Sequence, residues 1–249
     1  MDKNIDFNHV ADIYDYYVNV DFDVPFYIDF CKGYNSILEL MCGTGRVSIP
    51  LINEGYSLTC VDYSEDMLEV FKRKINNKDS VDIVCQDVCN LKLEKSYDLA
   101  IIPFNSIAEI TDYKKRKQAI QGVYNHLEQN GTFLCTLYNP SYRVKSADGN
   151  TKPLGEYNID DDKKLIVTYF NTFSEKEKLI SGVQFYEIYD SRNHLIEKRY
   201  LDINFSVIDK EEIVDVATSV GFSLKEIYGD YQKSLFTKDS PFMNFIFQK

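Results

Sequence analysis

Short apolar runs alternate with segments of helical spacing through the first half of the chain. Apolar runs between turn residues are typical of buried strands, and apolar positions three and four residues apart are typical of helices. On this basis we expect strands near 36–41, 57–61, 81–85, 97–102 and 131–138, and helices near 46–54, 65–76 and 113–128. This alternation predicts a parallel sheet with helices on both faces, and ligands bind such sheets beyond the carboxyl ends of the strands.

The pattern changes around residue 153, where apolar and polar positions begin to alternate one by one. This alternation is typical of antiparallel strands with one solvated face. We expect such strands over 164–172, 179–190 and 195–208. A helix then opens at Asp209, in a segment that resembles a capping box, and ends at Gly221. Two further strands, near 223–229 and 242–248, return to the main sheet.

The expected fold is α/β, with a doubly wound, Rossmann-like and mostly parallel seven-stranded sheet and a small antiparallel β lid inserted after the fifth strand. An aromatic-rich segment with helical spacing, over 7–31, precedes the sheet. We assign residues 1–150 to the core with this lead-in, 151–208 to the lid or substrate subdomain, and 209–249 to the completion of the core sheet.

The most informative segment follows the first expected strand. That strand carries Glu39 near its end and leads into a turn with Gly43 and Gly45, and the second expected strand ends in Asp62. Glycines let backbone N–H groups approach a ligand closely, and an acid at the end of the second strand can accept hydrogen bonds from both hydroxyls of a ribose. The segment therefore predicts a site for a ligand that contains adenosine.

Two cofactor classes use this device, namely dinucleotides and S-adenosylmethionine. A dinucleotide site has three glycines in the spacing G-x-G-x-x-G, and here Ser48 occupies the third place. Glu39 would repel a pyrophosphate, whereas it suits a ligand that carries an ammonium group and a sulfonium. The residues therefore favour S-adenosylmethionine over a nicotinamide cofactor.

Five segments, in order over roughly residues 10 to 140, resemble the motifs of the class I S-adenosylmethionine-dependent methyltransferases, especially the small-molecule branch. They are Glu39–Gly45, Val61–Leu68, Cys85–Val88, Tyr97–Ile107 and Leu127–Leu134. One departure is Met41, where the family often has glycine. The resemblance implies transfer of a methyl group to nitrogen or oxygen of a small molecule. It also implies that the inserted lid covers the active site and selects the substrate.

The resemblance assigns the cofactor contacts by position. Asp62 takes the ribose hydroxyls, Glu39 reaches the ammonium end, Tyr63 and Met67 pack against adenine, and Asp87 accepts from the adenine amino group. The full expected set is Tyr14, Glu39, Leu40, Met41, Gly43, Gly45, Arg46, Asp62, Tyr63, Met67, Gln86, Asp87, Val88, Pro103, Phe104 and Asn105.

The catalytic candidates are Glu109 and Tyr14. Glu109 falls where relatives often carry a histidine, so it is a candidate base, although a solvated acid at a helix start remains an alternative. Tyr14 precedes an aspartate, as does a tyrosine that closes over the cofactor in the resembled branch, although ordinary packing remains open for it and for Tyr17. The candidate acceptor contacts are Tyr138, Asn139, Tyr142, Arg143, Tyr186, Arg199 and Tyr200.

The composition and charge of the chain argue against several classes of binding partner. A net charge of −11 argues against a nucleic acid, whose phosphates need a basic surface, and makes a membrane partner unfavourable. The run Lys114–Lys117 fits a solvated helix face. No apolar run is long enough to span a bilayer and the N-terminus does not resemble a signal peptide, so we expect a cytoplasmic protein. Its six cysteines show no paired metal-ligand spacing, so we expect free thiols and no metal.

Two alternatives remain open at this point. One is a nicotinamide-dependent oxidoreductase on a related sheet, and the other is a non-catalytic protein that binds S-adenosylmethionine. The sequence names neither the acceptor nor the oligomeric state, and the isolated His9, His126 and His194 are weak catalytic candidates.

Overall fold

The computed structural model describes residues 5–75, 81–159 and 162–249. Within them, seven strands form one sheet in the order β10-β11-β5-β4-β1-β2-β3. The neighbours from β5 to β3 are parallel, and β11 is antiparallel to both β5 and β10. The bounds are β1 Ile37–Leu40, β2 Leu58–Asp62, β3 Val81–Cys85, β4 Tyr97–Ile102, β5 Leu127–Tyr138, β10 Ser223–Tyr228 and β11 Phe242–Gln248. The predicted doubly wound sheet is confirmed.

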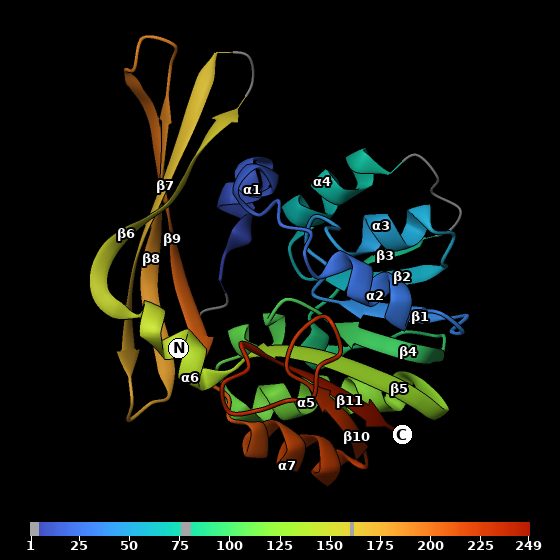
Figure 1. Ribbon diagram of the computed structural model, residues 1–249. Helices are drawn as coiled ribbons and strands as arrows, with labels where there is room; N and C mark the ends of the chain where they lie inside the picture. The colour runs from blue at the N-terminus through green and yellow to red at the C-terminus, as the bar shows by residue number, and fades with distance from the viewer. Residues whose placement is uncertain (1–4, 76–80, 160–161) are drawn as a thin grey trace.

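Helices cover both faces of this sheet (Figure 1). One face packs against α2 (Val24–Phe30), α3 (Ser48–Asn53) and α4 (Glu65–Lys74). The other face packs against α5 (Tyr113–His126) and α7 (Lys210–Val220). Each layer buries a continuous apolar core against β1, β4 and β5, as expected for strands that are apolar on both sides.

The ends of three helices test the predictions made from local sequence. Ser64 caps α4, because its Oγ accepts a hydrogen bond from the Met67 N–H at 3.3 Å. The first predicted helix begins late, at Ser48, and this places Pro50 in its first turn, where a proline is tolerated. The capping box at Asp209 is wrong: its side chain makes no cap hydrogen bond and pairs with Lys178 instead.

A second sheet, which we call the lid sheet, has four antiparallel strands in the order β6-β7-β8-β9. They are β6 Asp148–Ile159, β7 Lys163–Ser174, β8 Leu179–Tyr189 and β9 Leu195–Ser206. The sequence pattern predicted the last three but not β6. This edge strand is mostly exposed and contains Gly149, Pro153 and Gly155, so it lacks the alternation of a strand with one buried face.

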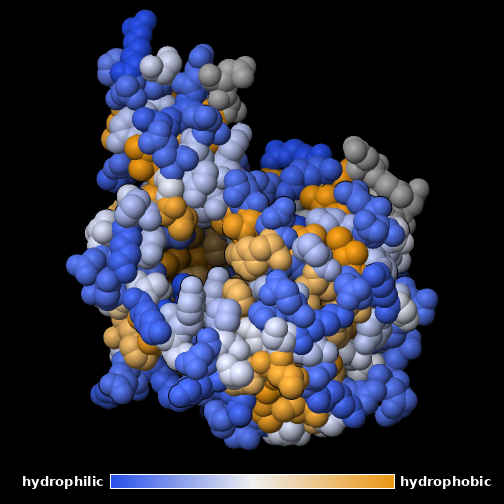
Figure 2. Space-filling model, viewed as in Figure 1, coloured by the Kyte–Doolittle hydropathy of each residue, from blue (hydrophilic) through white to orange (hydrophobic). Residues whose placement is uncertain are grey.

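The N-terminal segment lies between the two sheets. It contains η1 (Phe7–Val10) and α1 (Ala11–Tyr17), and α1 stands beside the lid sheet in Figure 1. Ile13 and Tyr17 pack with Leu165, Tyr186 and other lid residues in one apolar cluster. A hollow with apolar residues in its wall is visible between the lid sheet and the core (Figure 2).

No helix among the described residues is both long and apolar enough to cross a bilayer.

Candidate active site

The loop after β1 turns the backbone tightly at the carboxyl end of the sheet. Met41, Gly43 and Gly45 have positive φ angles of 59°, 55° and 83°. A Cβ added to Gly45 would lie 2.5 Å from Cε2 of Phe71, so α4 packs directly against the loop backbone. Glycine is needed there because the position combines a left-handed backbone with no room for a side chain.

Asp62, the last residue of β2, fixes the position of this loop. Its Oδ2 accepts a hydrogen bond from the Gly43 N–H at 2.8 Å, and its Oδ1 accepts one from the Ser64 N–H at 2.9 Å. Burial raises the pKa of Asp62, and these backbone hydrogen bonds oppose that rise. The loop and the predicted ribose-binding acid are therefore adjacent.

Glu39 lies beneath the same loop. The residue is 1% exposed, its Oε2 accepts a hydrogen bond from Ser48 Oγ at 2.7 Å, and burial raises its pKa to about 7. It lines a cavity of about 50 Å³, here called the Glu39 cavity. The other predicted cofactor residues in that wall are Tyr14, Met41, Gly43, Arg46, Pro103 and Phe104.

A second small cavity, of about 30 Å³, lies beyond the ends of β2 and β3, and we call it the Tyr63 cavity. Tyr63, Asp87 and Val88, the residues expected at the adenine end, line it. Asp87 also caps η3 (Val88–Asn90), where its Oδ1 accepts from the Cys89 N–H at 2.8 Å. Ile5 was not predicted: it lines this cavity, and its carbonyl accepts a hydrogen bond from the Tyr63 hydroxyl.

Besides Gly45 and Asp62, described above, four predicted cofactor residues line neither of the small cavities. Leu40 is buried in the core, and Met67 is buried beneath Gly43. Gln86 directs its side-chain amide to the backbone of Lys92, from whose N–H it accepts at 2.8 Å. The fourth, Asn105, has a left-handed backbone and accepts a hydrogen bond from the Tyr138 N–H at 3.0 Å.

Arg46 lines the Glu39 cavity but already has a partner. Its guanidinium forms an ion pair with the fully buried Asp23, with Nη1–Oδ1 and Nη2–Oδ2 distances of 2.5 and 2.7 Å. The same group lies 4.2 Å from the ring centroid of Phe104. Sequence reasoning missed Asp23, because the two residues are far apart in the chain and no motif joins them.

A larger cavity, of about 340 Å³, lies between α1, the ends of β4 and β5, and the lid sheet. We call it the acceptor cavity. Tyr138 and Arg143 line it, as expected from their position after β5. The described residues that line it and were not predicted as acceptor contacts are Phe7, Tyr14, Tyr17, Val18, Val20, Phe104, Asn105, Glu109, Ser146, Leu154, Tyr169, Asn171, Gln184, Ile203 and Phe205.

The other predicted acceptor contacts lie outside the wall of this cavity. Asn139 binds the carbonyls of Lys238 and Ser240, and Tyr142 and Tyr200 are exposed, at 56% and 67%. Tyr186 and Arg199 instead connect the lid sheet to α1. Because a strand's residues alternate between two faces, only the packed structure shows which face turns inward.

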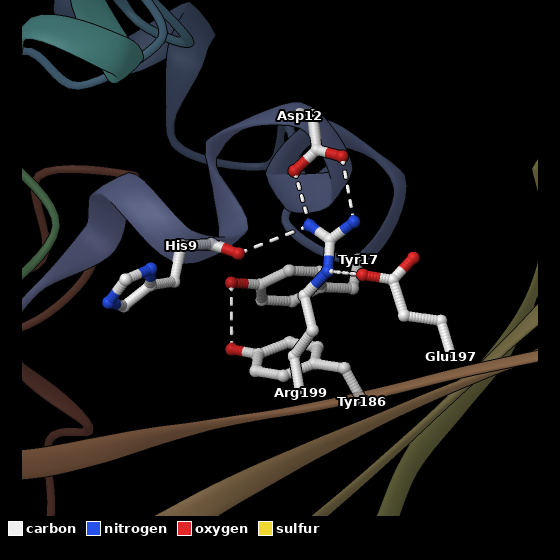
Figure 3. A network of polar contacts seen from close by, with 6 residues as sticks. All are labelled: His9, Asp12, Tyr17, Tyr186, Glu197 and Arg199. Carbon is white, nitrogen blue, oxygen red and sulfur yellow. Dashed lines mark hydrogen bonds and ion pairs between the residues drawn. The ribbon is translucent and has the colours of Figure 1, made fainter.

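Figure 3 shows this connection between α1 and the lid sheet. The Tyr17 and Tyr186 hydroxyls are 3.0 Å apart, and Tyr186 donates to Gln184 Oε1 at 2.9 Å. Arg199 donates to Asp12 at 2.5 Å and, as Figure 3 also shows, to Glu197 at 2.6 Å. On its other side, α1 reaches the glycine loop, since Thr44 Oγ1 donates to Asp15 at 2.5 Å. The helix that carries Tyr14 is thus held between the loop and the lid sheet.

The two catalytic candidates lie where the cavities meet. Tyr14 lines both the Glu39 cavity and the acceptor cavity, and Glu109, in η4 (Ser106–Glu109), lines both the Tyr63 cavity and the acceptor cavity. Burial, followed by the charge of Asp62, raises the pKa of Glu109 to about 8. Burial and the charge of Glu109 also raise the pKa of Tyr14.

None of the three histidines lines the Glu39, Tyr63 or acceptor cavity. His126 has a structural role: its Nδ1 lies 2.7 Å from the Gly122 carbonyl, and its Nε2 accepts from the Leu93 N–H at 3.0 Å. His9 and His194 are exposed and lie beside Asp6 and Asp190.

Comparison with known proteins agrees with this geometry. Residues 37–131 match a family model described as a methyltransferase domain. The putative methyltransferase YqeM of Bacillus subtilis is 23% identical over 200 residues, which make up 78% of this chain and 76% of that protein. The malonyl-[acyl-carrier protein] O-methyltransferase of Bacillus anthracis is 34% identical over 141 residues, which make up 53% of this chain and 51% of that protein.

Solved structures share the whole fold. An S-adenosylmethionine-dependent methyltransferase from Clostridium acetobutylicum superposes with a TM-score of 0.79 at 20% identity, over 97% of this chain and 98% of that one. The CcbJ methyltransferase of Streptomyces caelestis also gives 0.79, at 19% identity, over 98% and 96% of the two chains.

The fold is thus a Rossmann-like domain with a glycine loop at the carboxyl ends of its strands. Residues 37–131 match a methyltransferase domain, and the chain is similar over its whole fold to S-adenosylmethionine-dependent methyltransferases, as its motifs predicted.

Proposed function

We propose that this chain transfers a methyl group from S-adenosylmethionine to a nitrogen or oxygen atom of a small molecule held in the acceptor cavity. The main support for the proposal is that the acceptor cavity shares wall residues with each of the two small cavities. Tyr14 and Phe104 border both the Glu39 cavity and the acceptor cavity, and Glu109 borders both the Tyr63 cavity and the acceptor cavity. A ligand that spans the two small cavities therefore faces the acceptor along its middle.

The residues at the small cavities fit the cofactor. Oε1 of Glu39 accepts no hydrogen bond from the described residues and is available to an ammonium group. Asp62 has lone pairs left for ribose hydroxyls, while Tyr63 and Asp87 suit an adenine ring and its amino group. The proposal includes contacts from Leu40, Met41, Gly43, Gly45, Arg46, Met67, Gln86, Val88, Pro103, Phe104 and Asn105.

The Tyr63 cavity has about the volume of one water, so a nucleoside base requires it to widen. Ile5 lies across it and receives the Tyr63 hydrogen bond. We therefore propose that the segment at Ile5 moves aside when the cofactor enters and packs over it afterwards.

The cofactor supplies a methyl group that its sulfonium already activates. The chain has to hold the acceptor atom in line with that methyl and to exclude water, and positioning of this kind is worth ~7–11 kcal/mol. The aromatic residues Phe7, Tyr17 and Phe205 make much of the acceptor cavity apolar. We propose that residues 151–208 form the substrate subdomain, and that residues 1–150 and 209–249 form the cofactor-binding core.

Glu109 is the residue that we propose takes up the proton of the acceptor. It makes no hydrogen bond to a described residue, and its pKa is raised to about 8, so the ionised form that accepts a proton becomes abundant as the pH approaches 8. An amine or hydroxyl that attacks the methyl group must lose a proton, and Glu109 faces the cavity that would hold it. Tyr14, whose pKa is raised, would stay protonated and act as a hydrogen-bond donor.

The names of related proteins include methyltransferases that act on nitrogen and on oxygen, which supports either atom as the acceptor. KedS8 of Streptoalloteichus, with a TM-score of 0.78, is described as a sugar N-methyltransferase, and CalS10, with 0.74, as an amino pentose methyltransferase. The Bacillus anthracis relative is an O-methyltransferase. The net charge of −11 argues against nucleic acid as the substrate, and the six cysteines, none in a disulfide, fit the reducing cytoplasm.

Calorimetric titration with S-adenosylmethionine and S-adenosylhomocysteine tests the proposal. Both should bind the unmodified protein, and Asp62→Ala should abolish binding. Asp66→Ala, in the exposed first turn of α4, is the matched control and should bind normally. The assignment would be overturned if neither S-adenosylmethionine nor S-adenosylhomocysteine bound the unmodified protein. It would also be overturned if adding the protein increased the fluorescence of NADH. Binding without turnover on any metabolite extract would identify a sensor instead of an enzyme.

A further inference from the structure

Arg143 is a half-buried cation to which no described residue offers a carboxylate. It ends α6 (Pro140–Arg143), and its guanidinium lies 5.3 Å from the ring centroids of both Tyr138 and Phe205, at the wall of the acceptor cavity. Its Nε is buried without a hydrogen-bond partner, and no described residue forms an ion pair with the side chain. Burial lowers the pKa of Arg143, and the ionisable groups that oppose this are the phenols of Tyr138 and Tyr169, not carboxylates.

The other largely buried arginines of the chain are paired. Arg46 binds the two oxygens of Asp23, and Arg116 donates to Glu212 at 2.6 Å and to the Ile110 carbonyl at 2.7 Å. An arginine keeps its charge in proteins, and burying a charge without a counter-ion is costly. The half-buried guanidinium of Arg143 therefore has no counter-ion among the described residues, and an anionic ligand in the cavity would supply one.

A second residue with an unsatisfied polar atom lines the same cavity. Asn171, on β7, is 4% exposed, and its Oδ1 has no hydrogen-bond partner. Its cross-strand neighbour on β8 is Gly182, where an added Cβ would collide with that oxygen. The strand pair thus leaves space for a polar side chain that no protein group satisfies, and a ligand N–H or O–H is the missing partner.

We propose that the methyl acceptor is an anion: a small molecule whose carboxylate or phosphate group pairs with Arg143 and whose apolar or aromatic body lies among the rings of the cavity. This inference rests on the proposed function. The planar guanidinium can donate two parallel hydrogen bonds to either kind of group. Arg143 would then be a specificity-determining residue that directs the other end of the acceptor toward Glu109. In a chain of net charge −11 it supplies a local attraction for a negatively charged substrate.

Titration calorimetry on protein saturated with S-adenosylhomocysteine tests the inference with three probes: benzoate, phenyl phosphate and the neutral benzamide. At least one anion should bind about tenfold tighter than benzamide. The tighter of the two anions identifies the group as carboxylate or phosphate. Arg143→Met should abolish the preference and Arg143→Lys should keep part of it. Arg192→Met, in the exposed turn before β9, is the matched control and should keep all of it.

Three results would overturn the inference: equal binding of benzamide, failure of both anions to bind, or a preference that survives in Arg143→Met. Thermal unfolding gives an independent readout. Removing an uncompensated charge should leave the melting temperature of Arg143→Met unchanged or higher, whereas a merely structural role predicts a lower one. Binding of S-adenosylhomocysteine is measured first, and its absence identifies a failure of the proposed function itself.

Discussion

Gly45→Ala tests whether the loop after β1 depends on a glycine for both its backbone conformation and its packing. Gly45 has φ of +83°, and an added Cβ would lie 2.5 Å from Cε2 and 2.9 Å from Cγ of Phe71. Phe71 is fully buried within the core, so its ring cannot move away freely. Gly55 provides a matched control, because its φ is +90° and nothing lies within 4 Å of its added Cβ.

The two substitutions should differ by the steric contribution. A left-handed conformation costs a residue with a side chain about 1–2 kcal/mol, and both variants bear that cost. Overpacking a core contact adds about 1–3 kcal/mol, and only Gly45→Ala bears it. We expect losses in unfolding free energy of about 1–2 kcal/mol for Gly55→Ala and about 2–5 kcal/mol for Gly45→Ala.

Urea unfolding of both variants measures these losses, and a double-mutant cycle identifies their cause. Phe71→Ala removes the three atoms, Cγ, Cδ2 and Cε2, that the new methyl group would strike. The cost of Gly45→Ala in that background should therefore fall toward the cost of Gly55→Ala. Gly45→Ala should also weaken binding of S-adenosylhomocysteine, because the loop backbone shifts, whereas Gly55→Ala should not.

Equal destabilisation by Gly45→Ala and Gly55→Ala would refute the steric argument. So would a cycle in which Phe71→Ala and Gly45→Ala act additively. A destabilised Gly45→Ala variant that binds the nucleoside with unchanged affinity would separate the loop's packing from its role in binding.

Three further predictions follow from buried polar groups. Glu109 keeps its proton in the folded state up to about pH 8 but ionises near pH 4.5 in the unfolded chain. The free energy of unfolding should therefore fall as the pH rises from about 4.5 to about 8. Glu109→Gln should reduce that fall, as measured by urea titrations at several pH values. Arg116→Met should cost about 1.5–3 kcal/mol in urea unfolding, because it removes charged hydrogen bonds between α5 and α7. Tyr186→Phe leaves the buried Tyr17 hydroxyl without its partner and should lower the free energy of unfolding by about 1–3 kcal/mol. Arg199→Met removes an exposed ion pair and should lower it by under about 1 kcal/mol. A larger loss for Arg199→Met than for Tyr186→Phe would contradict this.

The sequence predicted most of the core because the relevant signals are local. The strands from β1 to β5 are short apolar runs bounded by turns, and each lies within a few residues of its predicted range. The edge strand β6 was missed because its glycines and Pro153 do not alternate with apolar residues. The capping box at Asp209 was wrong because Lys178, from the lid sheet, pairs with the same carboxylate.

Local sequence alone therefore determined the glycine loop, the acids at the ends of β1 and β2, and the resemblance to methyltransferases. These depend on turn chemistry and strand ends, which are properties of neighbouring residues. Only the tertiary structure decided which lid residues face the acceptor cavity, which arginines find a carboxylate and which one, Arg143, does not. Those outcomes depend on contacts between residues far apart in the chain. The alternation of residues along a strand does not indicate which of its two faces packs against another element.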